Sequence, residues 1–234
     1  MRDGRYGRQG RLAAPASGVR ARGGLLVLAL AIGCFGSAAH CLHSVLRFLP
    51  RTAAAARPTD ASVVAERERE AILSLVREHR RQAGDAWRQT LAEAVYLEAR
   101  EADMDPLLVA AMVATESSFK SRIVSKAGAV GLMQLRPFVA RDVALRGAVE
   151  WTGPETLNQP EVNVRLGILY FRELLERFDG DPHAALTAYN YGPTRVHEQI
   201  RDGRFEGSDY ARRILDLYEE LRGRRDTSQV PRSI

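Results

Sequence analysis

Residues 115–137 read Thr-Glu-Ser-Ser-Phe-Lys-Ser-Arg-Ile-Val-Ser-Lys-Ala-Gly-Ala-Val-Gly-Leu-Met-Gln-Leu-Arg-Pro, and the rest of the chain is organised around them. The stretch follows eight uncharged, mostly apolar residues, 107–114, which places Glu116 at the end of a predicted apolar helix. A carboxyl group held against such a helix is partly desolvated, and desolvation raises its pKa because it disfavours the anion. An acid that stays protonated near neutral pH can donate a proton to a glycosidic oxygen. The alternative is a solvated acidic residue at a helix end, and this helix alone does not decide between the two.

Three sequence blocks in a fixed order add to this pattern. The first is Ser125-Lys-Ala-Gly-Ala-Val-Gly-Leu-Met-Gln134, nine residues after Glu116. The second is Asn163-Val-Arg-Leu-Gly-Ile-Leu-Tyr170 with Leu174, Leu175 and Phe178, and the third is Ala188-Tyr-Asn-Tyr-Gly-Pro193 with Val196. Together they resemble the lysozyme-like lytic transglycosylases related to the catalytic domain of the soluble lytic transglycosylase. The resemblance covers residues 86–222, and residues 210–218 resemble the closing helix of that family.

The resemblance implies both a fold and a reaction. The fold would be nearly all-α, a predominantly helical member of the α+β lysozyme-like superfamily. The reaction would cleave the MurNAc-GlcNAc β-1,4 bond of peptidoglycan with Glu116 as acid and then as base. The 6-hydroxyl of the same muramic acid ring would be the nucleophile, and its proximity would replace the second carboxylate of ordinary glycosidases. Glu161, a predicted first-turn helix acid, stays open as a second group.

The same resemblance implies a set of substrate-binding residues. They are Ser125, Met133, Gln134, Tyr189 and Asn190. Each residue also has an ordinary structural interpretation: Ser125 as a turn residue, Met133 as a core side chain, and the Tyr189-Asn190 pair as the end of a helix. Gln134 is the stronger candidate for a hydrogen bond to a sugar.

Three positions depart from the family pattern. Arg136 stands where Met is common, Val139 where Thr is common, and Tyr191 where a small residue is usual. These departures concern the binding of substrate and leave the acid in place. From its position alone, Arg136 is predicted to meet a carboxylate of a stem peptide.

The positive charge of the chain is concentrated at its N-terminus. The sequence of 234 residues has a formal net charge of +5, but residues 1–57 contain nine Arg and one acid. The remainder is therefore mildly acidic, which gives no support to a nucleic-acid partner.

The basic N-terminal region precedes an apolar segment. Residues 23–42 contain no Lys, Arg or acid, and twenty helical residues would span ~30 Å, enough for a bilayer core. The excess of Arg before the segment predicts that the following domain lies in the periplasm or cell-wall space, anchored to the inner membrane. A cleaved signal peptide, or a lipoprotein signal at Cys34, would export the domain to the same side.

The chain shows no pattern for a metal or cofactor site. The five His residues lack paired-ligand spacing, and no Gly-rich phosphate loop is present. Cys34 and Cys41 both fall inside the apolar segment, where they are more simply small helix residues than a disulfide. We therefore expect no cofactor, and no protein partner is predicted.

The predicted organisation has five parts: a basic disordered tail over 1–22, a membrane segment over 23–42, a linker and spacer helix over 43–84, the catalytic domain over 85–222, and a tail over 223–234. Helices are predicted at about 60–82, 86–102, 106–116, 132–145, 160–178, 182–190 and 207–222. The helix at 60–82 is either a spacer or an addition to the domain.

Two other functions stay open at this stage. One is a hydrolase of the same fold, which would release reducing ends. The other is a non-catalytic protein that binds peptidoglycan as a scaffold. The products released from purified cell wall distinguish all three.

Overall fold

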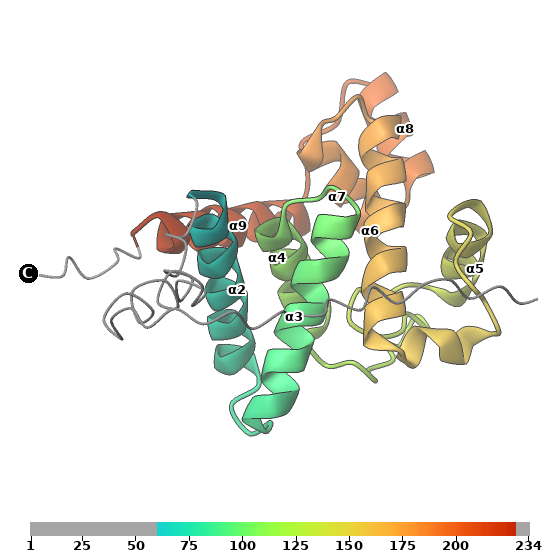
Figure 1. Ribbon diagram of the computed structural model, residues 1–234. Helices are drawn as coiled ribbons and strands as arrows, with labels where there is room; N and C mark the ends of the chain where they lie inside the picture. The colour runs from blue at the N-terminus through green and yellow to red at the C-terminus, as the bar shows by residue number, and fades with distance from the viewer. Residues whose placement is uncertain (1–59, 228–234) are drawn as a thin grey trace, which may run out of the picture. The chain divides into compact units, whose positions relative to one another are not determined.

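The computed structural model describes residues 60–227, and these residues form a helical domain (Figure 1). The elements are α2 (Asp60–His79), α3 (Asp85–Glu101), α4 (Pro106–Ser117), α5 (Pro137–Arg146), η1 (Pro154–Asn158, a 3-10 helix), α6 (Pro160–Arg177), α7 (Pro182–Tyr191), α8 (Pro193–Arg201) and α9 (Asp209–Thr227). No β-strand occurs within residues 60–227, where β pairing is limited to isolated bridges from Val130 to Val124 and to Leu135. The prediction of a nearly all-α domain is confirmed.

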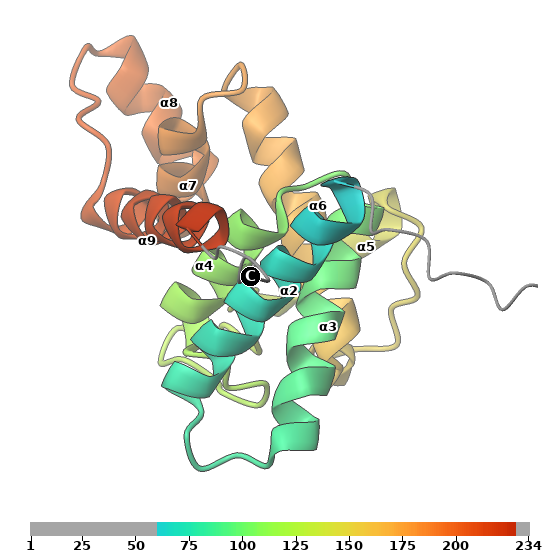
Figure 2. The ribbon, with the colours of Figure 1, turned by 60° about the vertical axis from the view of Figure 1, so that its left-hand side comes forward.

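Helix α4 lies at the centre of the domain and contacts α2, α3 and α9 (Figures 1 and 2). Its side chains are buried on almost every face, as a helix without charges requires. The helix starts sharply because the Asp105 carboxylate accepts a hydrogen bond from Leu107 N at 2.9 Å and Pro106 occupies the first turn. Tyr218 of α9 donates to the same carboxylate at 2.7 Å and ties the two helices together.

Helix α2 is part of the same core. Its apolar stripe, which includes Ile72, Leu75 and Val76, is buried against the rest of the domain. Arg69 also forms an ion pair with Glu93 of α3 at 3.0 Å. Of the two interpretations of this helix, the packing therefore matches an addition to the domain, and the core reaches N-terminal to the predicted boundary at residue 85.

Several element boundaries differ from the sequence prediction. Helix α5 starts at Pro137, not near 132, because Gly131 and Gln134 have positive φ angles that no helix accommodates. Helix α9 continues past 222 to Thr227, where Arg224 pairs with Glu78 of α2 at 2.9 Å. The sequence analysis did not predict η1 or α8. Helix α8 starts at Pro193, directly after Gly192, whose φ angle is 90°.

The predicted membrane segment, 23–42, and both cysteines lie outside the described residues. Among residues 60–227, no helix combines the length and the apolar character that crossing a membrane requires.

Candidate active site

Glu116 is the next-to-last residue of α4, and the chain turns away immediately after it. Ser118 and Phe119 have φ angles of 49° and 59°, in the left-handed region that non-glycine residues rarely adopt. Two such residues in succession cost conformational free energy, which other contacts must offset. The fully buried Phe119 side chain provides such contacts. The end of α4 is thus held in place, and with it the carboxyl group of Glu116.

The environment of Glu116 favours its protonated form. Burial raises the pKa of this carboxyl group to about 7, against an opposing hydrogen bond from Tyr210 that lowers the pKa. Tyr210, in the first turn of α9, donates this bond from its hydroxyl to Glu116 Oε1 at 2.5 Å. No group within residues 60–227 hydrogen-bonds the other oxygen, Oε2, which is therefore available to carry the exchangeable proton.

The loop after α4 is held by a buried side chain of α6. Asn163 is fully buried, and its Oδ1 accepts from Met133 N at 2.8 Å. Its Nδ2 donates to the carbonyl oxygens of Val130 and Leu157, both at 3.0 Å. Gly131 passes so close to this amide that a Cβ there would lie 2.1 Å from Asn163 Nδ2. Asn163 therefore fixes the path of the whole Gly-Leu-Met-Gln turn.

Met133 is a core side chain in this structure. It is fully buried against Gly167 of α6, where a Cβ would lie 2.6 Å from the methionine Cβ and Cγ. A sugar cannot contact that side chain, so the substrate contact implied by the resemblance does not fit it. The position acts through its backbone, because the Met133 carbonyl accepts a hydrogen bond from the Tyr189 hydroxyl at 2.8 Å.

Tyr189 lines a cavity and lies close enough to Glu116 for the charge of that carboxyl group to act on its hydroxyl. The pKa of its hydroxyl is raised well above the usual value, first by burial and then by the charge of Glu116. Its ring lies 5.2 Å from that of Tyr170, and both rings line a cavity of about 230 Å³. Glu116 itself does not line this cavity.

The other residues around the cavity come from two segments that are distant in sequence. The lining residues include Gln134, Arg136, Phe138 and Val139 from the turn and α5, and Asn190, Tyr191, Gly192 and Pro193 from the junction of α7 and α8. The Gln134 amide nitrogen donates to the Gly131 carbonyl at 2.9 Å, which leaves its oxygen without a partner among the described residues. Asn190 is exposed at the rim.

Ser125 lies in the turn that precedes the cavity wall. Its hydroxyl oxygen accepts from Ala129 N at 3.0 Å, and its own N–H donates to the Ala129 carbonyl at 2.9 Å. These bonds match the turn role; the hydroxyl hydrogen is still free to donate to a ligand.

The sequence analysis did not single out two residues that shape the candidate site, Tyr210 and Asn163. Tyr210 was noted only as the start of a closing helix, and its pairing with Glu116 spans 94 residues of chain. Asn163 was noted only as the first residue of a block, although a polar residue in an otherwise apolar helix face signals a buried hydrogen-bonding role.

If cavity volume were the only criterion, a different part of the domain would be chosen as the binding site. A larger cavity of about 540 Å³ lies along α3 and α6, and none of the predicted site residues lines it. Within residues 60–227, no group of three or more His, Cys, Asp or Glu side chains is arranged to hold a metal ion.

The arrangement as a whole is suited to general acid–base chemistry. A carboxyl group with a pKa of about 7 divides its population between acid and base at neutral pH. Its charge acts on Tyr189, which lines a cavity with aromatic and amide walls. Aromatic rings offer apolar contact area and amide groups offer hydrogen bonds, and a sugar can use both. The fold and site thus define a helical domain with one buried carboxylic acid, Glu116, as its candidate acid–base group.

Comparison with known proteins identifies the family. Residues 95–210 match the family model of the Transglycosylase SLT domain. The chain is 35% identical over 111 residues to a transglycosylase of Enterobacteria phage PRD1, covering 47% of this chain and 37% of that protein. It is 30% identical over 127 residues to the soluble lytic murein transglycosylase of Salmonella typhimurium, covering 53% of this chain and 19% of that protein.

A solved structure agrees with the sequence matches. An inactive mutant of lytic transglycosylase Slt from Pseudomonas aeruginosa superposes with a TM-score of 0.54 at 26% identity, over 58% of this chain and 24% of that chain. This chain therefore belongs to the transglycosylase SLT-domain family. It spans less than two fifths of the length of these relatives.

Proposed function

We propose that this protein is a peptidoglycan lytic transglycosylase that cleaves the MurNAc-GlcNAc β-1,4 bond and leaves a 1,6-anhydro end. The observation that carries the proposal is the carboxyl group of Glu116, which burial holds at a pKa of about 7 beside Tyr210. The names of the relatives, which include lytic murein transglycosylases, support this choice of substrate.

In the first step, Glu116 acts as the general acid. The Oε2–H group donates its proton to the glycosidic oxygen as the bond from that oxygen to the anomeric carbon breaks. Tyr210 holds Oε1 at 2.5 Å and so orients the other oxygen toward the substrate. Its hydrogen bond also stabilises the carboxylate that forms when the proton leaves.

In the second step, the same carboxylate acts as the base. It accepts the proton of the muramic acid 6-hydroxyl while that oxygen bonds to the anomeric carbon, and no water is consumed. A pKa near neutrality serves both steps, because the group must lose and regain one proton in each turnover.

The substrate would lie along the cavity next to Tyr189. In this proposal the Gln134 oxygen, the Ser125 hydroxyl and the Asn190 amide bind the sugar. Tyr189, held by its hydrogen bond to the Met133 carbonyl, forms part of the wall. The sequence supports placement outside the cytoplasm, with residues 23–42 as a membrane anchor. Recovery of an N-terminal tag in the washed membrane fraction would support the anchor, and its loss during export would support signal cleavage.

The test is mass spectrometry of the muropeptides that the full chain releases from purified sacculi. We expect products lighter by one water than hydrolytic products, and a loss of about 100-fold or more in rate for Glu116→Gln. Glu161→Gln is the matched control, since Glu161 is an exposed first-turn acid of α6 and its loss should leave the rate unchanged. Reducing-end products would change the reaction to hydrolysis, and no release by a folded protein would favour a binding role.

A further inference from the structure

Two arginine–aromatic pairs stand on opposite segments around the cavity near Glu116. On the α5 side, the Arg136 Cζ lies 5.0 Å from the ring centroid of Phe138. On the α8 side, the Arg195 Cζ lies 4.9 Å from the ring centroid of Tyr191. Phe138 and Tyr191 both line the cavity and are 54% and 47% exposed, so each pair borders solvent as well as the cavity.

Neither arginine has an ion-pair partner within residues 60–227. Some other surface arginines of the domain are paired, as Arg146 is with Glu173 and Arg165 with Glu98, each at 2.7 Å. The ring beneath each guanidinium restricts the side chain while its N–H groups stay available to a ligand. Each of these two cations, held over a ring and without a carboxylate partner, is suited to bind an anion.

These cations do not act on the acid itself. The pKa of Glu116 responds to burial and to the Tyr210 hydrogen bond, and no nearby cation contributes to its shift. The charge of Arg136 and Arg195 is therefore directed at something other than the catalytic carboxyl group.

The local charge differs in sign from that of the domain. Residues 60–227 contain 28 Asp and Glu against 24 Lys and Arg, a formal net charge of −4. Residues 117–136, which form the turn before α5, contain two Lys, two Arg and no acid, whereas Arg141 of α5 is paired with Asp142 at 3.1 Å. A positive region at the site of an acidic domain attracts an anionic ligand to that place.

We propose that Arg136 and Arg195 bind carboxylate groups of the peptides that branch from the glycan strand, and so favour cleavage next to peptides whose carboxylates are free. This inference rests on the proposed function for the identity of the strand. A planar guanidinium matches a carboxylate with two parallel hydrogen bonds, which a neutral amide cannot reproduce.

The experiment compares three forms of the same glycan with the full chain. The first carries intact peptides, the second has the peptide carboxylates converted to carboxamides, and the third has its peptides removed by an amidase. The third form exposes the lactyl carboxylate of each muramic acid, so it separates that source of charge from the peptides. The readout is the initial rate of anhydro-muropeptide or anhydro-glycan release.

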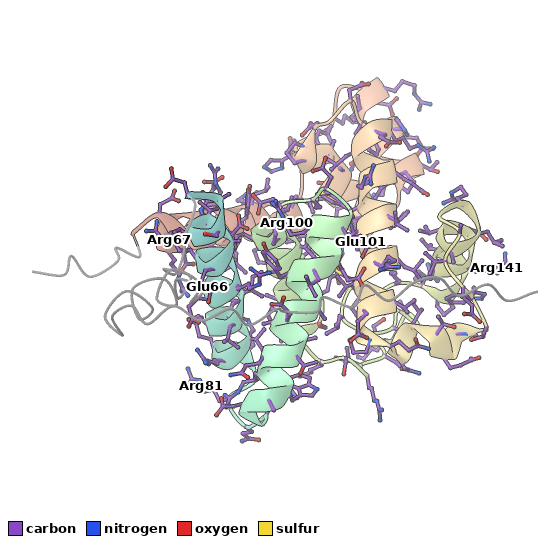
Figure 3. All side chains as sticks on the ribbon, viewed as in Figure 1. Glu66, Arg67, Arg81, Arg100, Glu101 and Arg141 are labelled. Atoms are coloured by element: carbon purple, nitrogen blue, oxygen red, sulfur yellow. The ribbon has the colours of Figure 1, made fainter. Side chains whose placement is uncertain are left out.

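The expected result is an intact-to-carboxamide rate ratio of about three to ten for the unmodified protein, from two exposed charge-assisted contacts. Arg136→Gln combined with Arg195→Gln should bring the ratio close to one. The control is Arg81→Gln, which removes one positive charge by the same type of substitution at an exposed arginine in the loop after α2. In Figure 3 this residue lies on the opposite side of the view from Arg141 of α5, and its loss should leave the ratio intact.

Two outcomes would overturn the proposal: an unchanged ratio in the double variant, or an equal advantage for the amidase-treated glycan, which would assign the contact to the lactyl group. If no form of the glycan is cleaved, the proposed function fails, but the arginines are still tested by co-sedimentation of Glu116→Gln with the three forms. Preferential binding of the intact form that disappears with Arg136→Gln and Arg195→Gln would support the arginine site, and preferential binding that persists would refute it.

Discussion

In the proposed mechanism, the chemistry depends on the carboxyl group of Glu116 and on Tyr210, which donates a hydrogen bond to it from α9. Burial and the Tyr210 hydrogen bond shift the pKa of Glu116 in opposite directions, and burial prevails. The resulting value of about 7 is set by the balance of these two effects. A change in either one should therefore move the pH at which the enzyme works.

Tyr210→Phe tests this balance. The hydrogen bond lowers the pKa of Glu116, so its removal should raise that pKa. Since the first step needs the protonated acid, the alkaline limb of kcat/KM should move to higher pH, by roughly one unit for a lost bond to a charged acceptor. The measurement is the pH profile of kcat/KM on soluble glycan.

Tyr218→Phe provides the matched control for that measurement. It removes another tyrosine–carboxylate hydrogen bond from α9, to Asp105 at 2.7 Å, where no catalytic role is proposed. This variant should lose stability and keep the unmodified pH profile. An alkaline limb that stays in place or moves down in Tyr210→Phe would contradict the assigned role of Tyr210.

At the scale of elements, α6 organises the turn that forms the wall of the site. Asn163 bonds three backbone groups of that region, and Gly167 admits the Met133 side chain. The turn contains no helix or strand and only isolated β bridges. The Asn163 side chain therefore bonds backbone groups that a regular element would otherwise pair. The geometry of Gln134 therefore depends on a helix 30 residues further along the chain.

Asn163→Ala should be strongly destabilising. It leaves Met133 N–H and the Leu157 carbonyl oxygen buried without partners and removes one of the two hydrogen bonds to the Val130 carbonyl, at a cost of about 3–5 kcal/mol in free energy of unfolding. Urea unfolding followed by tryptophan fluorescence measures the loss. Asn158→Ala, at an exposed position of η1, should change stability by less than about 0.5 kcal/mol. Equal stabilities for the two variants would refute the clamp role of Asn163.

At the scale of the whole molecule, the core extends beyond the part that matches the family. The family match covers residues 95–210, whereas α2 ends at His79 and still buries an apolar stripe against α4 and α9. Helix α4 carries Glu116 and α9 carries Tyr210. Because α2 packs against both helices, it supports both partners of the Glu116–Tyr210 hydrogen bond.

Removal of α2 should therefore lower the free energy of unfolding far more than the removal of an exposed segment would. Ile72, Leu75 and Val76 are fully or almost fully buried, and each such side chain contributes roughly 1.5–3 kcal/mol. We expect a chain of residues 60–234 to unfold cooperatively and a chain of residues 85–234 to lose several kcal/mol or its cooperative transition. Thermal unfolding by near-UV circular dichroism compares them, and equal melting temperatures would make α2 a mere spacer.

The amino-acid sequence is enough to predict the helical class, most helix positions, the family, and Glu116 as the candidate acid. These follow from local patterns: an uncharged helix that ends in a Glu, prolines at first helical turns, and three ordered blocks. The packing of the helices was needed to show that Tyr210 contacts Glu116 and that Met133 is a core residue. It was also needed to show that Arg136 lines the same cavity as Tyr191, the ring beneath Arg195. The physical reason is that these relations join segments up to 94 residues apart. Such contacts depend on how helices pack against each other, which no local period or spacing records.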